Sequence, residues 1–390
     1  MKVVTMADRR LRILASTLTR DVTGIEHSVI RLLPRLGEQG VNVVMAAPSG
    51  GELEQTWNEM GLEFIPMPDG ARVGLHDSSG ASQTPATLLS QIPRSATWVS
   101  KLLVHARRAD VVHSNSLLSH LDCVAAGRLA RTPVVLEIHD ILDPGRGRSL
   151  LSSAVRGASA AIAVSNAARQ QLSKSAQRKT TVVPQGVDSA VFAPGPATVR
   201  AELTDAPDSA LVAVVGRVDP VKGIDTLIEA VSQIRSRGKD LHLVIVGRSS
   251  PGNERYGENL RRKAAELAPG AVRFVGQRND VAAILRSVDI LCVPSVREPF
   301  GLIAIEAMSV GTPVVASRTD GFLDYVVDGE NGLLSVPGDS ADVAGRILSL
   351  LDDRQLRARL VTGARRSVLE DHAVSARADR LIDVYRRVAK

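Results

Sequence analysis

Aromatic residues are scarce in this chain, and the scarcity argues against one class of partner. Phe, Trp and Tyr together make up 3% of its 390 residues. Proteins that grip single-stranded nucleic acid stack the bases on aromatic side chains, so we expect no nucleic-acid partner. The formal net charge of +6 is explained most simply by diffuse surface basicity. It would also suit an anionic substrate or an anionic membrane surface.

Cysteines are also few, and long apolar runs are missing. Cys123 and Cys292 are the only cysteines, and both lie in apolar stretches typical of buried thiols rather than of a disulfide or a metal pair. The eight histidines and two cysteines show no ligand spacing, so we expect no metal. No bound cofactor is expected either. No apolar run approaches a membrane span, and residues 1–10 are polar and basic, unlike a signal peptide. These absences predict a cytoplasmic protein, with association with the inner face of the membrane as an alternative.

What is present is a globular composition with a break near its middle. Hydrophobic residues make up 44% of the chain and charged residues 23%, and the length is sufficient for two domains with separate cores. The Ala-Pro-Gly-Pro stretch at 193–196 cannot continue a helix or a strand, so it is the natural linker.

The second half opens with a pattern that suits a diphosphate. An apolar strand is expected at 211–215, followed by Gly216-Arg217 and, five residues later, Lys222-Gly223 before a helix begins. Two glycines permit close backbone approach, and two cations supply fixed positive charge. The alternative is that both cations are merely solvated surface residues.

A strand, turn and helix at 290–313 carry the most specific pattern. Glu298 lies in the turn, Gly301 precedes the helix, and Glu306 lies within an apolar helical stretch. Free N–H groups at the helix start favour an anion, and carboxylates suit hydroxyl groups, so the combination predicts a sugar diphosphate site. The alternative is that Glu298 caps the helix and Glu306 pairs with an arginine.

The first half reads as a second α/β domain. A strand at 11–16, a helix at 25–39 and a strand at 41–47 form its opening, without the Gly-x-Gly-x-x-Gly of a dinucleotide site. Two later strands end in His113 and in His139, and strand ends are where open parallel sheets bind ligands. For His113 a structural role is the simpler interpretation. The Gly- and Ser-rich stretch 70–82 is interpreted as an acceptor-side loop.

The paired glutamates carry a family resemblance. Glu298 and Glu306, with seven residues between them in the setting Glu-Pro-Phe-Gly-Leu, Glu-Ala-Met and Gly-Thr-Pro-Val-Val-Ala, resemble the signature of the retaining glycosyltransferases of family 4. The resemblance implies the α/β GT-B fold: two Rossmann-like domains facing across a cleft, with a C-terminal helix that crosses back to the first. It predicts an acceptor-side domain at 1–193, joined by roughly 372–390, and a donor domain at 194–371.

The same resemblance assigns roles to single residues. His139 would face the donor sugar, Glu306 would meet the ribose, and the segment with Val275 and Arg278 would meet the base. The expected catalytic residues are Glu298, His139, Arg217 and Lys222. The expected donor-binding residues are Gly24, Gly216, Val275, Arg278, Phe300, Gly301, Leu302 and Glu306.

Together these features predict a metal-independent, retaining hexosyltransferase. Its co-substrate would be a nucleoside diphosphate sugar, with UDP favoured, and its acceptor would be a small molecule, a glycan or a lipid-linked compound. Two alternatives stay open at this point: a nucleotide-sugar epimerase of related architecture, and a non-catalytic two-domain sugar-binding protein.

Overall fold

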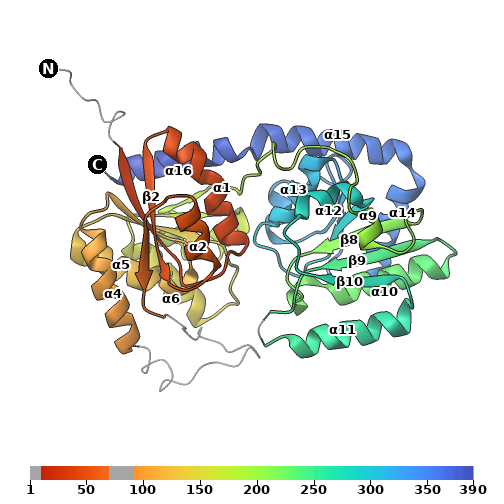
Figure 1. Cartoon of the computed structure of the whole chain (residues 1–390), viewed down its shortest axis with the longest axis horizontal. Helices are drawn as coiled ribbons and strands as arrows, with labels where there is room; N and C mark the ends of the chain where they lie inside the picture. The colour runs from red at the N-terminus through yellow and green to blue at the C-terminus, as the bar shows by residue number, and fades with distance from the viewer. Residues whose placement is uncertain (1–9, 70–91, 251, 390) are drawn as a thin grey trace. The chain divides into compact units, whose positions relative to one another are not determined.

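The chain folds as two compact α/β units, one formed by Met1–Gln185 with Val374–Lys390 and the other by Gly186–Ala373. The structure, a computed structural model, describes residues 10–69, 92–250 and 252–389. Each unit is a parallel sheet with helices on its faces (Figure 1). The prediction of two Rossmann-like domains is therefore confirmed. The stretch 70–82, interpreted as an acceptor-side loop, lies outside the described residues.

The division between the units falls earlier than the linker at 193–196. Arg286 donates hydrogen bonds of 2.7 Å to the carbonyl oxygens of Val191 and Ala193, and the Phe192 side chain is buried. The residues from Gly186 onward therefore pack with unit 2. Pro and Gly indicate where regular structure stops, but they do not say against which core the linker lies.

The sheet of unit 1 has seven strands in the order β3-β2-β1-β4-β5-β6-β7, and all its paired strands are parallel. The strand order reverses between β1 and β4, which is the point where open α/β sheets bind ligands. The strands are β1 Leu11–Ser16, β2 Val41–Pro48, β3 Phe64–Met67, β4 Val111–Ser114, β5 Val134–Ile138, β6 Ala160–Ala163 and β7 Thr180–Val182.

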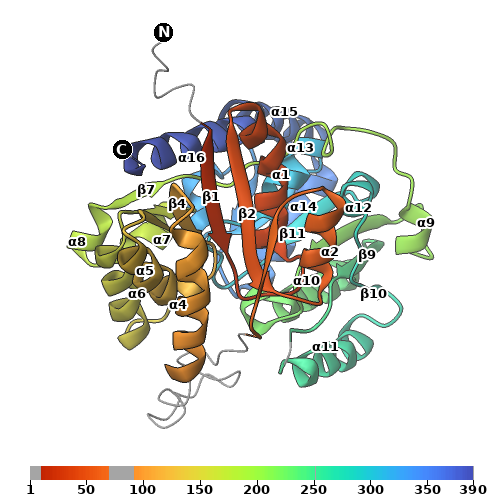
Figure 2. The same ribbon diagram turned by 60° about the vertical axis from the view of Figure 1, so that its left-hand side comes forward.

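Helices cover both faces of this sheet. Figure 2 shows α4, α5 and α6 grouped on one side of the β1 and β2 ribbons and α1 and α2 on the other. The final helix α16 packs beside α1, and the apolar side chains of both join one core with the strands. The predicted return of the C-terminal helix is thus confirmed. The helices are α1 Gly24–Glu38, α2 Glu52–Glu59, α4 Ile92–Ala106, α5 His120–Ala130, α6 Arg146–Gly157, α7 Asn166–Gln170, α8 Lys174–Gln177 and α16 Val374–Val388, with the 3-10 turn η2 Leu117–Ser119.

Unit 2 repeats this design with six strands in the order β10-β9-β8-β11-β12-β13. Its reversal point lies between β8 and β11. The strands are β8 Ala210–Val215, β9 Leu241–Val246, β10 Val272–Gly276, β11 Ile290–Val293, β12 Val314–Ser317 and β13 Leu333–Ser335. The helices are α9 Arg200–Leu203, α10 Ile224–Ser236, α11 Glu254–Leu267, α12 Val281–Ser287, α13 Leu302–Val310, α14 Ser340–Asp352 and α15 Arg354–Asp371, with the 3-10 turns η3 Pro220–Lys222 and η4 Asp320–Asp324.

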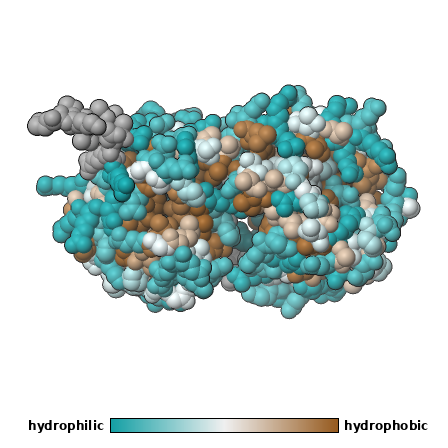
Figure 3. All heavy atoms as spheres, turned by 45° about the horizontal axis from the view of Figure 1, so that its top comes forward, coloured by the Kyte–Doolittle hydropathy of each residue, from teal (hydrophilic) through white to brown (hydrophobic). Residues whose placement is uncertain are grey.

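The inner strands of both sheets are almost entirely apolar because helices cover both of their faces. On the outside, Figure 3 shows hydrophilic atoms over much of the visible face, with apolar atoms gathered in patches on both units. Helix α4 is amphipathic, since Trp98 and Leu102 are buried while Arg94, Thr97 and Ser100 are exposed. No helix within the described residues is long and apolar enough to cross a bilayer.

Candidate active site

Two loops meet at the reversal point of the unit 2 sheet. One follows β8 and the other follows β11, and the two strands are neighbours. The Val296 N–H donates a 2.9 Å hydrogen bond to the Val221 carbonyl, which joins the loops directly. Gly223 has a φ of +63°, and a Cβ there would fall 2.1 Å from the Pro294 carbonyl oxygen. Only glycine allows this approach, so Gly223, the second glycine of the diphosphate pattern, lets the two loops meet.

The central contact of this site joins two residues that the sequence singled out. The Lys222 ammonium lies 2.6 Å from the Glu298 carboxylate, and their side chains are 22% and 9% exposed. The Ser295 hydroxyl donates a further 3.1 Å hydrogen bond to the same carboxylate. Lys222 retains other donors that a ligand can meet, because an ammonium group has three. Arg217 is exposed at the end of β8.

The backbone around Glu298 is held by the turn after β12. The Glu298 N–H donates to the Asp320 carboxylate at 3.1 Å, and the Glu298 carbonyl accepts from the Gly321 N–H at 3.0 Å. Asp320 adopts a φ of +43°, a left-handed conformation in which Asp is enriched among residues other than glycine. Sequence reasoning missed Ser295 and Asp320. The position of Asp320 just after a buried strand was the available signal.

Helix α13 begins at this loop as predicted. Its N-cap is Gly301 with a φ of +85°, and a Cβ there would lie 2.3 Å from the Phe322 ring. Leu302 is the first helical residue, so its amide belongs to the helix end that attracts anions. Glu306 follows one turn later and is buried. The site thus combines a cation, a carboxylate and a helix N-terminus.

The Phe300 ring lies in the core of unit 2. It stacks on Tyr325 with ring centroids 5.0 Å apart and is 4% exposed, and the Tyr325 hydroxyl donates to the carbonyls of Phe300 and Gly301. Its aromatic side chain therefore holds the loop in shape. A donor that reached Phe300 would meet its backbone.

The other predicted donor contacts of unit 2 are spread along the sheet. Gly216 follows β8 directly, and Gly247 packs against it so closely that a Cβ on Gly247 would lie 1.8 Å from the Gly216 oxygen. Val275 lies on the edge strand β10. Arg278 pairs with Asp280 at 2.6 Å and with Glu202 at 2.8 Å, and these hydrogen bonds raise its pKa. A base contact by Arg278 would therefore compete with two carboxylates.

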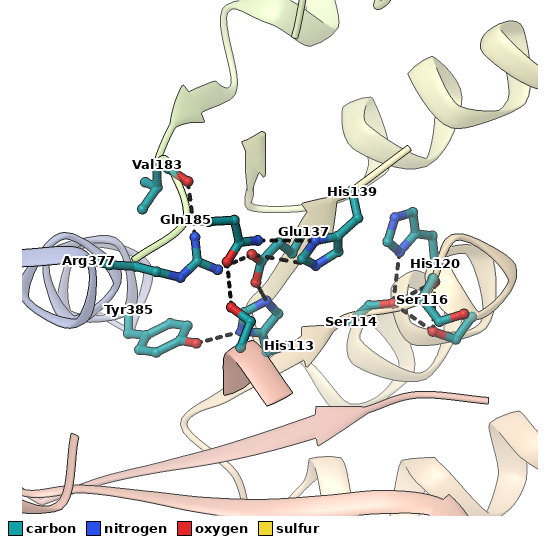
Figure 4. Close-up of polar contacts among 12 residues, drawn as sticks. His113, Ser114, Ser116, His120, Glu137, His139, Val183, Gln185, Arg377 and Tyr385 are labelled. Carbon is teal, nitrogen blue, oxygen red and sulfur yellow. Dashed lines mark hydrogen bonds and ion pairs between the residues drawn. The ribbon is translucent and has the colours of Figure 1, made fainter. Parts of the chain in front are cut away.

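In unit 1, His139 follows β5 and joins a buried polar cluster (Figure 4). Its Nε2 lies 3.5 Å from the Glu137 carboxylate, and its Nδ1 lies 3.4 Å from the Gln185 amide nitrogen. Burial is the largest influence that lowers the His139 pKa. Both ring nitrogens thus have protein groups nearby, which leaves the carbon edge of the ring and the main chain for a ligand. Gly24 begins α1, with open space around its α-carbon.

A second histidine lies close to this cluster. The His120 Nδ1 is 2.8 Å from the Ser114 hydroxyl, and burial lowers the pKa of His120 to about 3. The nearby His139 and His113 lower it further. His120 is therefore neutral throughout the ordinary pH range. Nothing in its sequence context distinguished it, since it follows an unremarkable run of Ser and Leu.

Comparisons with known proteins agree with this geometry. Residues 197–367 match the family described as Glycosyl transferases group 1, and residues 22–191 match the one described as Glycosyltransferase Family 4. The chain is 33% identical over 289 residues to a phosphatidyl-myo-inositol mannosyltransferase of Mycobacterium leprae, which covers 72% of this chain and 74% of that one.

Further similar proteins share parts of the chain or its fold. A D-inositol 3-phosphate glycosyltransferase of Stackebrandtia nassauensis is 39% identical over 219 residues, and the chain spans about half of its length (48%). The crystal structure of HepE of Anabaena, in complex with UDP and glucose, superposes with a TM-score of 0.83 at 22% identity over 96% of this chain and 99% of that one. This last likeness concerns the fold. The chain therefore belongs to glycosyltransferase family 4 and has the GT-B fold.

Proposed function

We propose that the chain transfers a sugar from a nucleoside diphosphate donor, with UDP favoured, to a hydroxyl acceptor with retention of configuration. Unit 2 would hold the donor, and unit 1 would supply the acceptor side. The bond from the anomeric carbon to the diphosphate would break, and the acceptor oxygen would bond to the same face of that carbon. The acceptor proton would pass to the leaving diphosphate, so no separate general base is required.

The observation that supports this most is the Lys222–Glu298 pair beside the N-terminus of α13. A diphosphate needs positive charge and amide donors, which Lys222, Arg217 and the first turn of α13 can provide. Sugar hydroxyls need acceptors, which Glu298 can provide. These groups come from loops at the reversal point of one sheet, where open α/β sheets bind ligands.

The acceptor belongs to the same proposal. Similar proteins are named for inositol 3-phosphate and for phosphatidyl-myo-inositol. We propose these two compounds as the first acceptors to test, because both present a ring of hydroxyl groups beside a phosphate.

The decisive experiment incubates the chain with UDP-glucose and UDP-N-acetylglucosamine, first alone and then with each acceptor. Slow release of free sugar, accelerated or diverted to a new product by an acceptor, is the expected result. A Glu298→Gln variant prepared in parallel controls for contaminating hydrolases. Appearance of an epimer of the donor sugar would establish an epimerase instead. Absence of turnover with GDP- and ADP-linked sugars as well would leave only a binding protein.

We predict that Arg217→Ala and Lys222→Ala each weaken binding of the nucleoside diphosphate. Each change removes a charge-assisted contact worth about 1.5–3 kcal/mol. Calorimetric titration with UDP, GDP and ADP measures the loss. Lys263→Ala is the matched control, because Lys263 pairs with Glu229 at 2.5 Å on the helical surface of unit 2. Affinities equal to those of the unaltered chain in both variants would refute the assignment of Arg217 and Lys222 to the diphosphate.

We also predict that chelators leave the activity unchanged. Within the described part of the chain, no group of three or more His, Cys, Asp or Glu side chains could hold a metal ion. Lys222, Arg217 and the α13 amides would instead balance the charge that develops on the diphosphate. Activity assays with EDTA, and then with added Mg²⁺ or Mn²⁺, test this. Loss of activity that either ion restores would contradict it.

A further inference from the structure

Glu137 is a buried carboxylate that the proposed reaction does not use. It lies on β5 and is 1% exposed. Arg377 approaches one of its oxygens at 2.5 Å, and the Nε2 atoms of His113 and His139 lie at 3.2 and 3.5 Å (Figure 4). Burial acts to raise the pKa of the Glu137 carboxyl, but the charge of Arg377 and the two histidines hold it well below its usual range.

The partner cation comes from the other end of the chain. Arg377 lies on α16 and is 2% exposed. Besides Glu137, its guanidinium donates to the carbonyls of Val183 at 3.2 Å and Pro184 at 2.9 Å, just before the chain leaves unit 1. The same helix supplies Tyr385, whose hydroxyl lies 2.5 Å from the His113 Nδ1. Helix α16 therefore contacts His113 directly through Tyr385, and it is linked to His139 through Arg377 and Glu137.

The arrangement favours one tautomer of His139. The His139 Nε2 lies 3.5 Å from Glu137 without hydrogen-bond geometry. An ionised carboxylate attracts an N–H and repels a nitrogen lone pair, so Nε2 is favoured to carry the proton. The other nitrogen, Nδ1, faces the amide group of Gln185, which donates. The Ser28 hydroxyl donates to the Gln185 oxygen, which keeps the amide nitrogen turned toward His139. Both neighbours of the ring thus favour the same form, with the proton on Nε2.

We infer that Arg377 is a positioning residue: by balancing Glu137 it holds His139 in the Nε2-protonated tautomer and fixes its ring at the end of β5. The inference rests on the proposed function only in that His139 acts in sugar transfer. The C-terminal helix would then be required for catalysis, although none of its residues would touch the substrate.

A purely structural role makes a different prediction. Replacing a buried ion pair by apolar residues of similar volume is often neutral or stabilising. If Arg377 and Glu137 only held α16 in place, such a replacement would preserve activity together with the fold. If they position His139, the fold would be kept while the tautomer preference and the rate would be lost.

The experiment compares the unaltered chain with the double variant Glu137→Leu/Arg377→Met. Thermal unfolding reports the fold, and ¹⁵N NMR of the histidine rings reports the tautomer, with signals assigned from His139→Gln and His113→Gln variants. We expect a folded protein in which His139 loses its Nε2-protonated form. We also expect kcat to fall about tenfold or more with little change in the donor KM. Asp379→Asn is the matched control, because Asp379 forms an exposed pair with Arg35 on the surface of α16. This variant should change neither the tautomer of His139 nor kcat.

The outcomes separate this inference from the proposed function. A folded double variant that keeps the tautomer of His139 or the kcat of the unaltered chain overturns the positioning role. If the unaltered chain transfers no sugar, the proposed function fails, while the NMR comparison still decides whether Arg377 sets the tautomer. If the double variant does not fold, Glu137→Gln/Arg377→Gln carries the same comparison with polar groups of similar shape.

Discussion

Replacing Glu298 by Gln is expected to lower kcat by about a hundredfold or more and to change the donor KM little. Glu298 lies in a loop held by Ser295, Asp320 and Gly321, so its carboxylate is fixed before the donor arrives. A fixed group that interacts most strongly at the transition state contributes to kcat. Loss of one such preorganised contact typically costs on the order of 10²–10³ in rate. Steady-state kinetics with a UDP-sugar donor measures the effect.

The comparison variant is Glu306→Gln, which should mainly raise the donor KM. Glu306 lies on the buried helix α13, one turn beyond its start, and its proposed contact with the ribose exists in both ground and transition states. Gln preserves the shape and helix propensity of Glu, so both variants should stay folded. If Glu306→Gln unfolds unit 2 while Glu298→Gln has unaltered kinetics, then the two glutamates are structural.

The second large effect concerns stability rather than rate. Arg377→Met alone is expected to destabilise the protein by about 3–5 kcal/mol, because it leaves the Glu137 carboxylate buried without its cation. The double variant with Glu137→Leu should recover much of this loss. Thermal and denaturant unfolding of four proteins, the unaltered chain, the two single variants and the double variant, form the required cycle. A single variant as stable as the unaltered chain would mean that Glu137 is not ionised in the fold.

The pH dependence of this destabilisation follows from the direction of the Glu137 pKa. In the unaltered chain that pKa is depressed, so the stability it contributes is present above the unfolded value and is lost as the pH falls through the folded value. Without Arg377, burial raises the pKa of the Glu137 carboxyl instead, and protonation of Glu137 removes the buried, unpaired charge. The difference in Tm between the unaltered chain and the Arg377→Met variant should therefore narrow as the pH falls from neutral toward the ordinary pKa of a glutamate.

The sequence by itself determined the fold class and singled out the residues of the proposed donor-side site. Apolar strands followed by Gly216, Gly223 or Gly301 predicted where sheets end and ligands approach, since glycine alone tolerates those backbone conformations and close contacts. The family resemblance grouped Lys222 and Glu298 among the expected catalytic residues, and in the structure they lie 2.6 Å apart. Local patterns suffice here because each residue is placed by the strand that immediately precedes it.

The tertiary structure alone decided which distant residues complete these sites. Asp320 meets Glu298 because β12 lies beside β11, and the strand order is not written in any local stretch. Arg377 and Glu137 are 240 positions apart, and their sequence context is that of an ordinary helix and an ordinary strand. The preference of His139 for one tautomer depends on groups from β5, α1, α16 and the segment after β7. The Arg377–Glu137 pair forms only when the packing of the core brings α16 against the strands of unit 1. Because Glu137 is buried there, its ionised form needs a nearby cation, and Arg377 on α16 provides it.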